Sequence, residues 1–157
     1  MDAVLTQGAA EFVRPLAFEA LTGRPVLSSL WERGGALSHV RLAQGADLLL
    51  VAPATANLIA RMAQGLADDL LTAMLLAATA PIVLAPGMND EMFAHPQTAA
   101  NLERVRARGV TIVGPDIGAL AEGPSDRPGR MSEPEVILAH ALRVVRSGGR
   151  LAGRRVV

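Results

Sequence analysis

The stretch that decides the fold is LLLVAPATAN, residues 48–57, an apolar run that ends at a proline and continues into a helix-starting turn. Leu48–Ala52 carries no polar side chain, which is typical of a parallel strand covered on both faces. The run ends at Pro53, and Thr55 is placed to cap a helix that continues to about Gln64. This segment predicts one strand–helix unit of an α/β fold.

The same alternation of strand and helix extends in both directions. Short apolar runs predict strands at 3–5, 48–52, 82–85 and 110–113, and the segments between them predict helices at 8–13, 15–21, 55–64, 68–78, 96–108 and 134–146. Residues 114–132, rich in glycine and proline, are predicted to form a long loop. The pattern predicts an α/β fold with a parallel sheet and helices on both faces. Ligands bind beyond the carboxyl ends of such strands, so the loops after Ala52, Ala85 and Val113 are the expected site.

Composition excludes several classes of protein. Fifteen basic and fifteen acidic residues cancel in 157 residues, which argues against nucleic acid or a membrane surface as a partner. Cysteine is absent, so disulfides, thiolate nucleophiles and Cys-ligated metals are excluded, and the three histidines lack the spacing of a metal site. Leu70–Met88 holds no charge, but Pro81 and Pro86 interrupt it, which favours a buried helix and strand over a membrane span. We expect a soluble, cytoplasmic protein of one main domain.

Four motifs occur in a fixed order. They are Ser38-His39, PATAN at 53–57 followed by GLADDLL at 65–71, PGMNDEMF at 86–93, and GPDIGALAEGPSDRPGRMSEP at 114–134. Together they resemble the homo-oligomeric flavin-containing cysteine decarboxylases, most closely the phosphopantothenoylcysteine decarboxylase branch of coenzyme A biosynthesis. The resemblance covers nearly the whole chain. It implies a Rossmann-like or flavodoxin-like fold, FMN as cofactor, and 4′-phospho-N-pantothenoylcysteine as the small-molecule cysteine conjugate that is decarboxylated.

The resemblance also implies a domain organisation. Residues 1–146 correspond to the decarboxylase-like domain, without the first strand and glycine-rich phosphate loop with which the family begins. Residues 147–157 correspond to a linker and, in LAGRRVV, to the start of a ligase-like domain that can be fused behind the decarboxylase. Family members are trimers or dodecamers whose sites lie between subunits, so a homo-oligomer is expected.

The family's site residues map onto matching positions of this sequence. The resemblance implies that His39 is the catalytic acid or base, a role that suits imidazole because it exchanges protons near neutral pH. The substrate-binding positions are Met88, Asn89, Ala121, Arg130 and Met131, with Asn89 on the substrate carboxylate. The expected cofactor-binding positions are Thr6, Phe12, Pro53, Ala54, Thr55, Ala56 and Asn57. Simpler interpretations stay open, since a lone histidine is more often structural, and Thr55 and Asn89 both suit helix caps.

The sequence departs from the family pattern most clearly at Glu122. This residue stands where the family has a cysteine that supplies a proton in the second, reductive half of the reaction. A glutamate carboxyl has a pKa of about 4.3 in water and is ionised at neutral pH unless it is buried. The same loop is one residue longer than the pattern, Gly87 replaces an alanine or serine, and Phe93 replaces a tryptophan.

Two alternatives therefore remain beside the coenzyme A reaction. Relatives that oxidatively decarboxylate the carboxyl-terminal cysteine of a peptide stop at the enethiol and need no reductive cysteine, which suits Glu122. Other members have lost site residues and act as non-catalytic regulatory subunits. Retention of His39 and Asn89 argues against the second alternative.

Overall fold

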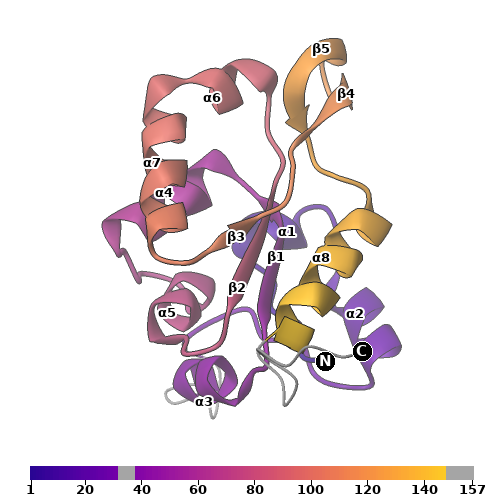
Figure 1. Ribbon diagram of the computed structural model, residues 1–157. Coiled ribbons are helices and arrows are strands. Elements are labelled where there is room, and N and C mark those ends of the chain that lie inside the picture. The colour runs from indigo at the N-terminus through magenta and orange to yellow at the C-terminus, as the bar shows by residue number, and fades with distance from the viewer. Residues whose placement is uncertain (32–37, 148–157) are drawn as a thin grey trace, which may run out of the picture.

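The computed structural model describes residues 1–31 and 38–147 (Figure 1). Helices and strands alternate through most of this part of the chain. In order, the elements are α1 (Gln7–Ala10), α2 (Pro15–Thr22), α3 (Ser38–Gly45), β1 (Leu49–Ala54), α4 (Ala56–Gln64), α5 (Leu70–Ala77), β2 (Ile82–Pro86), α6 (Asp90–Ala94), α7 (Pro96–Ala107), β3 (Thr111–Ile112), β4 (Asp116–Leu120), β5 (Gly123–Arg130) and α8 (Pro134–Ser147). The predicted linker and ligase-like start at 148–157 lie outside the described residues.

A parallel sheet in the order β1-β2-β3 forms the centre of the fold. The two apolar runs predicted as strands, 48–52 and 82–85, are β1 and β2 to within two residues. The uncharged stretch 70–88 divides into α5 and β2, as predicted from its prolines. None of the helices in the described part of the chain has the length and apolar character needed to cross a bilayer.

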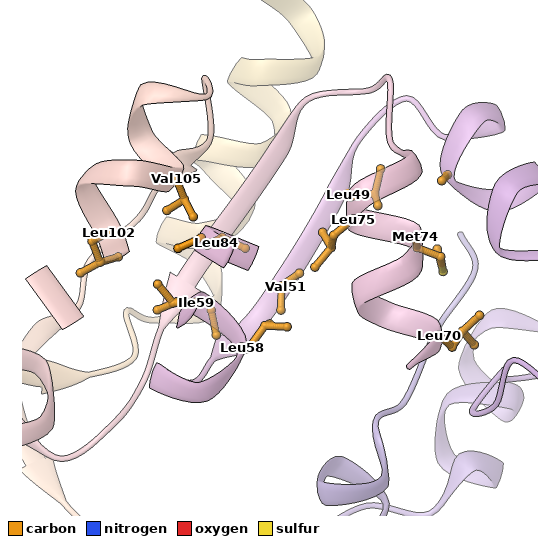
Figure 2. Close-up of a cluster of buried hydrophobic side chains, with 13 residues drawn as sticks. Leu49, Val51, Leu58, Ile59, Leu70, Met74, Leu75, Leu84, Leu102 and Val105 are labelled. Carbon is orange, nitrogen blue, oxygen red and sulfur yellow. The ribbon is translucent and has the colours of Figure 1, made fainter. Parts of the chain in front are cut away.

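One face of the sheet is covered by α4, α5 and α7. Leu84 of β2 is fully buried on this face, where Figure 2 shows it between Ile59 of α4 and Leu102 and Val105 of α7. Burying one such leucine stabilises the fold by about 1.5–3 kcal/mol. Branched aliphatic side chains supply this packing, as expected for a chain with few aromatic residues.

The opposite face is covered by α8. Val83 and Ala85, which alternate with Leu84 along β2, are fully buried together with Val113 and with Ile137 of α8. Successive strand residues point to opposite faces, so β2 is apolar throughout because helices cover it on both sides. The predicted parallel sheet with helices on both faces is confirmed.

The strand predicted near the amino terminus is reduced to an isolated bridge. Residues 3–5 were expected to form a strand, but only Val4 forms a bridge, parallel to Leu27. Within the described residues, β1 pairs with β2 alone, so its second edge is unpaired. Leu50, on β1, is 44% exposed. In the described part of the chain, β1 is therefore an edge strand of the three-stranded sheet.

A half-buried polar network joins α4 to α5. Asp69 caps α5 by accepting from the Thr72 backbone N–H at 2.8 Å, and the buried Thr72 hydroxyl donates back to the Asp69 carboxylate. Arg61 of α4 donates to Asp69 at 2.7 Å and also pairs with Asp68. The ADD portion of GLADDLL thus fixes the start of α5 relative to the end of α4.

Two further elements differ from the sequence predictions. The predicted loop 114–132 contains a two-stranded antiparallel ladder, β4 with β5. Its prolines and glycines favour a loop in a sequence analysis, yet a two-stranded ladder has open edges and irregular register that accommodate them. Ser38-His39, predicted as strand or loop, begins helix α3.

Candidate functional site

Three loops meet at Gly87, directly after β2. A Cβ atom at this position would lie 3.2 Å from the Cβ of Pro53, which is near the end of β1, and 3.2 Å from the Cβ of Met131, which follows β5. The Gly87 N–H also donates to the Ala54 carbonyl at 3.2 Å. The absence of a side chain at Gly87 lets PATAN, the Asn89 turn and the end of the hairpin contact one another. The structure thus brings together Pro53, Ala54, Met88, Asn89 and Met131.

Asn89 caps the first turn of α6. Its Oδ1 accepts from the backbone N–H groups of Glu91 at 2.9 Å and Met92 at 3.3 Å. This use of the oxygen leaves the two hydrogens of the amide nitrogen without an acceptor among the described residues. Capping and ligand binding are therefore compatible at Asn89, because they use different atoms of one side chain.

The PATAN turn presents small and polar groups at the carboxyl end of β1. The Thr55 hydroxyl accepts from the Leu58 N–H at 3.3 Å, as its predicted capping role requires. Pro53, Thr55 and Asn57 are exposed, while Ala54 is buried and Ala56 is half-buried. An exposed turn of small residues with a free amide at Asn57 fits a flat ligand that carries polar edges.

The other predicted cofactor positions flank α1. Thr6 caps this helix, with its hydroxyl accepting from the Ala9 N–H at 3.1 Å. Phe12 follows the helix, and 90% of its surface is exposed. In the described residues, no hydrogen bond or ion pair joins these two residues to PATAN.

The hairpin carries the remaining positions that the sequence predicts to bind substrate. Ala121 and Glu122 form its turn between β4 and β5, and both are exposed. Arg130 ends β5, pairs with Glu133 and lies across Gly118, where a Cβ atom would approach the Arg130 Cδ to 2.9 Å. Met131, which contacts Gly87, joins the base of the hairpin to the site, whereas Glu122 is at its far end.

His39 is not beside the Asn89 turn in a single chain. It lies on α3, which packs against α5. In Figure 1, α3 is at the opposite end of the molecule from α6 and the hairpin. The Nδ1 atom of His39 is buried and has no hydrogen-bond partner among the residues that the structure describes. The other two histidines are exposed, and His95 caps α7 by accepting from the Gln97 N–H at 3.1 Å.

The sequence analysis missed four polar residues that join the hairpin to α6. The Ser125 hydroxyl donates to the Asp90 carboxylate, and Arg127 pairs with Asp90 and Glu91. The only signal was opposite charge, with an acidic pair inside MNDEMF and an arginine in the lengthened part of the loop. No group of three or more potential metal-ligating side chains is found in the part of the chain that the structure describes.

Comparison with known proteins gives a consistent result. A family model described as Flavoprotein matches residues 1–146. The chain is 45% identical over 142 residues to the coenzyme A biosynthesis bifunctional protein CoaBC of Vibrio cholerae. The matched segment covers 89% of this chain but only 35% of that relative. The chain therefore spans about a third of the length of the curated relatives it matches.

Two solved structures are also similar. The FMN-dependent cysteine decarboxylase SpaF has a TM-score of 0.77 at 35% identity, covering 92% of this chain and 79% of that one. A mutant PPC decarboxylase complexed with pantothenoylaminoethenethiol has a TM-score of 0.77 at 30% identity, covering 94% and 83%. The predicted family and the predicted Rossmann-like or flavodoxin-like fold are confirmed by these matches.

Proposed function

Because the chain belongs to the flavoprotein family, we propose that it decarboxylates a cysteine conjugate with FMN as cofactor. The substrate that we propose is 4′-phospho-N-pantothenoylcysteine, converted to 4′-phosphopantetheine in coenzyme A biosynthesis. The observation that carries the proposal is the meeting of three loops at Gly87, which gathers PATAN, Asn89 and Met131 at one end of the sheet. The similarity to CoaBC supports the pathway.

The flavin would be held by the PATAN turn and the segment around α1. Phe12 offers an exposed aromatic ring for stacking, and Asn57 offers an amide to the polar edge of the flavin. Bound FMN would supply the two-electron redox chemistry that oxidation of the substrate thiol requires. The remaining steps, which are orientation of the carboxylate and transfer of protons, fall to residues of the chain.

Asn89 would bind the substrate carboxylate through its amide nitrogen. Its oxygen is already fixed by the Glu91 and Met92 N–H groups, so the amide hydrogens have a defined direction before substrate binds. Met88, Ala121, Arg130 and Met131 would surround the rest of the conjugate. A neutral donor orients a carboxylate without holding it so strongly that its loss as CO2 is prevented.

His39 would act as the acid or base, and a second copy of the chain would bring it to the site. Two observations support a homo-oligomer with sites between subunits. First, α3 and the Asn89 turn lie at opposite ends of one chain (Figure 1). Second, large apolar side chains of α2 and α8 are exposed, including Leu16 at 71%, Leu21 at 84% and Leu138 at 56%. Light scattering coupled to size exclusion tests the oligomer, and a monomer would refute a shared site.

Glu122 favours a second candidate function, the oxidative decarboxylation of a carboxyl-terminal cysteine in a peptide. The side chain is exposed at the hairpin turn, where the structure provides it with no hydrogen-bond partner among the described residues. A reaction that ends at the enethiol does not need the proton that the family cysteine supplies. The similarity to SpaF, itself an FMN-dependent cysteine decarboxylase, also fits this candidate.

One experiment separates the two candidates. Flavin-loaded protein is incubated with 4′-phospho-N-pantothenoylcysteine or with a peptide ending in cysteine, and CO2 and product mass are measured. A saturated thiol from the first substrate supports the coenzyme A reaction. An enethiol from the peptide, two hydrogens lighter than the saturated thiol of the same decarboxylated peptide, supports the alternative. Absence of CO2 from both substrates refutes the proposed function.

Matched variants test the site residues. Asn89→Asp and Asn89→Ser both keep a capping oxygen, but neither has an amide nitrogen, so both are expected to fold and to lose turnover. For the cofactor, Asn57→Ala is expected to retain less FMN after desalting than Gln64→Ala, an exposed amide at the other end of α4. Equal retention of FMN by these two variants would remove Asn57 from the proposed flavin site.

A further inference from the structure

The hairpin is tied to the first turn of α6 by side chains that the family resemblance does not assign. Asp90, the first residue of α6, has a side chain that is only 15% exposed. Its Oδ1 accepts from the Glu91 N–H at 2.8 Å, and its Oδ2 accepts from the Ser125 hydroxyl. Both carboxylate oxygens are therefore used, one within the turn and one across to β5.

Arg127 adds the positive charge to this contact. Its guanidinium lies 3.5 Å from the Asp90 carboxylate and also pairs with Glu91. The Arg127 backbone N–H donates to the Ser125 oxygen at 3.1 Å, which fixes the hydroxyl between the two elements. The hydrogen bond from Ser125 and the charge of Arg127 together hold the pKa of Asp90 below its ordinary value, so the carboxylate is ionised at neutral pH.

The backbone reinforces the same contact. The Met88 N–H donates to the Gly129 carbonyl at 2.9 Å, next to Asn89. Gly129 is buried against this turn, since a Cβ atom there would lie 2.7 Å from the Met88 carbonyl oxygen. Both neighbours of Asn89 in the chain therefore contact β5. Met88 does so through its backbone N–H, and Asp90 does so through its side chain.

From this arrangement we infer that Ser125 and Arg127 are positioning residues for catalysis, which hold the hairpin against the Asn89 turn through Asp90 and Glu91. The inference rests on the proposed function. The N–H of Glu91 is one of the two groups that fix the Asn89 oxygen. Loss of the contact would therefore disturb the direction of the Asn89 amide and, at the same time, the distance from Asn89 to Arg130 and Met131 on the hairpin.

Single substitutions in the hairpin test this role. Ser125→Ala and Arg127→Gln are compared with two controls, Asp126→Ala, an exposed residue between them, and Arg104→Gln, an exposed arginine on α7. We expect kcat/KM for decarboxylation to fall about tenfold in each test variant, comparable to the loss of one charge-assisted hydrogen bond. We expect most of the fall to appear in KM, because the chemical groups themselves remain.

Amide hydrogen exchange supplies a second readout that does not depend on turnover. In Ser125→Ala and Arg127→Gln, the backbone amides of Met88 and of the non-proline residues within 116–130 are expected to exchange at least severalfold faster than in the wild type and in both controls. Ser125→Thr, which keeps a hydroxyl, is expected to restore both the exchange rates and KM. Glu91→Gln combined with Arg127→Gln is expected to be little worse than Arg127→Gln alone, because the two residues form one contact.

The outcomes distinguish this inference from the proposed function. If the wild type releases CO2 while Ser125→Ala and Arg127→Gln match it in kinetics and exchange, the positioning role is wrong and the proposed function stands. Faster exchange with unchanged kinetics likewise refutes the role, because the contact is then purely structural. If the wild type decarboxylates neither substrate, the proposed function fails and the inference fails with it.

Discussion

Gly129 is the position where one added methyl group tests how closely the hairpin packs on the turn before α6. A Cβ atom there would lie 2.7 Å from the Met88 carbonyl oxygen and 3.1 Å from the Asp90 nitrogen. Ordinary van der Waals contact begins at 3.4 Å, so Gly129→Ala requires the two backbones to separate by roughly 0.7 Å, the difference between 2.7 and 3.4 Å. Both neighbouring atoms belong to the backbone and cannot rotate away.

The energetic cost follows from these contacts. Forcing an extra methyl group into a packed region costs about 1–3 kcal/mol. The separation also stretches the 2.9 Å hydrogen bond from Met88 to Gly129, which contributes a further ~1 kcal/mol. We therefore expect the free energy of unfolding to fall by about 2–4 kcal/mol in Gly129→Ala.

Urea denaturation followed by circular dichroism measures this change. Gly45→Ala is the matched control, since nothing lies within 4 Å of a Cβ atom at Gly45. That variant is expected to unfold at the same urea concentration as the wild type or slightly above, because alanine restricts the unfolded chain more than glycine does. Equal midpoints for Gly129→Ala and the wild type would refute the close packing of hairpin and turn.

Three further predictions concern the helices around the site. Thr72→Val removes a buried hydroxyl from the α4–α5 network and is expected to lower the free energy of unfolding by about 1–3 kcal/mol in urea denaturation, whereas the exposed Thr79→Val should change little. Burial acts to raise the pKa of Asp69, but its bonds to Thr72 and Arg61 outweigh this effect and leave the pKa below 3.8. The resulting stabilisation is complete above the ordinary pKa of a free aspartate and is lost as the pH falls through the lowered value. In unfolding curves recorded from neutral pH to below 3.8, the free energy of unfolding of Asp69→Asn should therefore fall less with acid than that of the wild type. Arg108→Ala removes donors to two backbone carbonyls at the end of α4. It is expected to lower the free energy of unfolding by about 1 kcal/mol and with it the thermal midpoint, and an unchanged midpoint would contradict that capping role.

The sheet was predictable because its strands are apolar on both faces. A strand such as LLLVA or IVLA has apolar side chains on both faces, and both faces must be covered to keep them from water. The sequence therefore located β1 and β2 to within two residues. The helix starts at Thr55 and Pro96 were also predictable, because capping and proline placement act within one turn of the chain.

The hairpin and the position of α3 depend on contacts that a local pattern does not contain. Pro124 and Pro128 lie within β5, although proline is rare in strands that pair on both sides. The ladder forms because β5 also packs on α6, through residues more than thirty positions earlier in the chain. The place of His39 relative to Asn89 is likewise a matter of tertiary packing, which the motif order did not reveal.

The free edge of β1 has a consequence for how the protein behaves at high concentration. In the described part of the chain one side of β1 is unpaired, and an unpaired strand side offers N–H and C=O groups to any extended segment that approaches it. Leu50 on this strand is 44% exposed. Association by strand addition is therefore favoured before the core unfolds. Pro53 limits it, because a residue without an N–H interrupts the template near the carboxyl end of the strand. We expect aggregates to nucleate on the first residues of β1 and to leave the PATAN end of the sheet open.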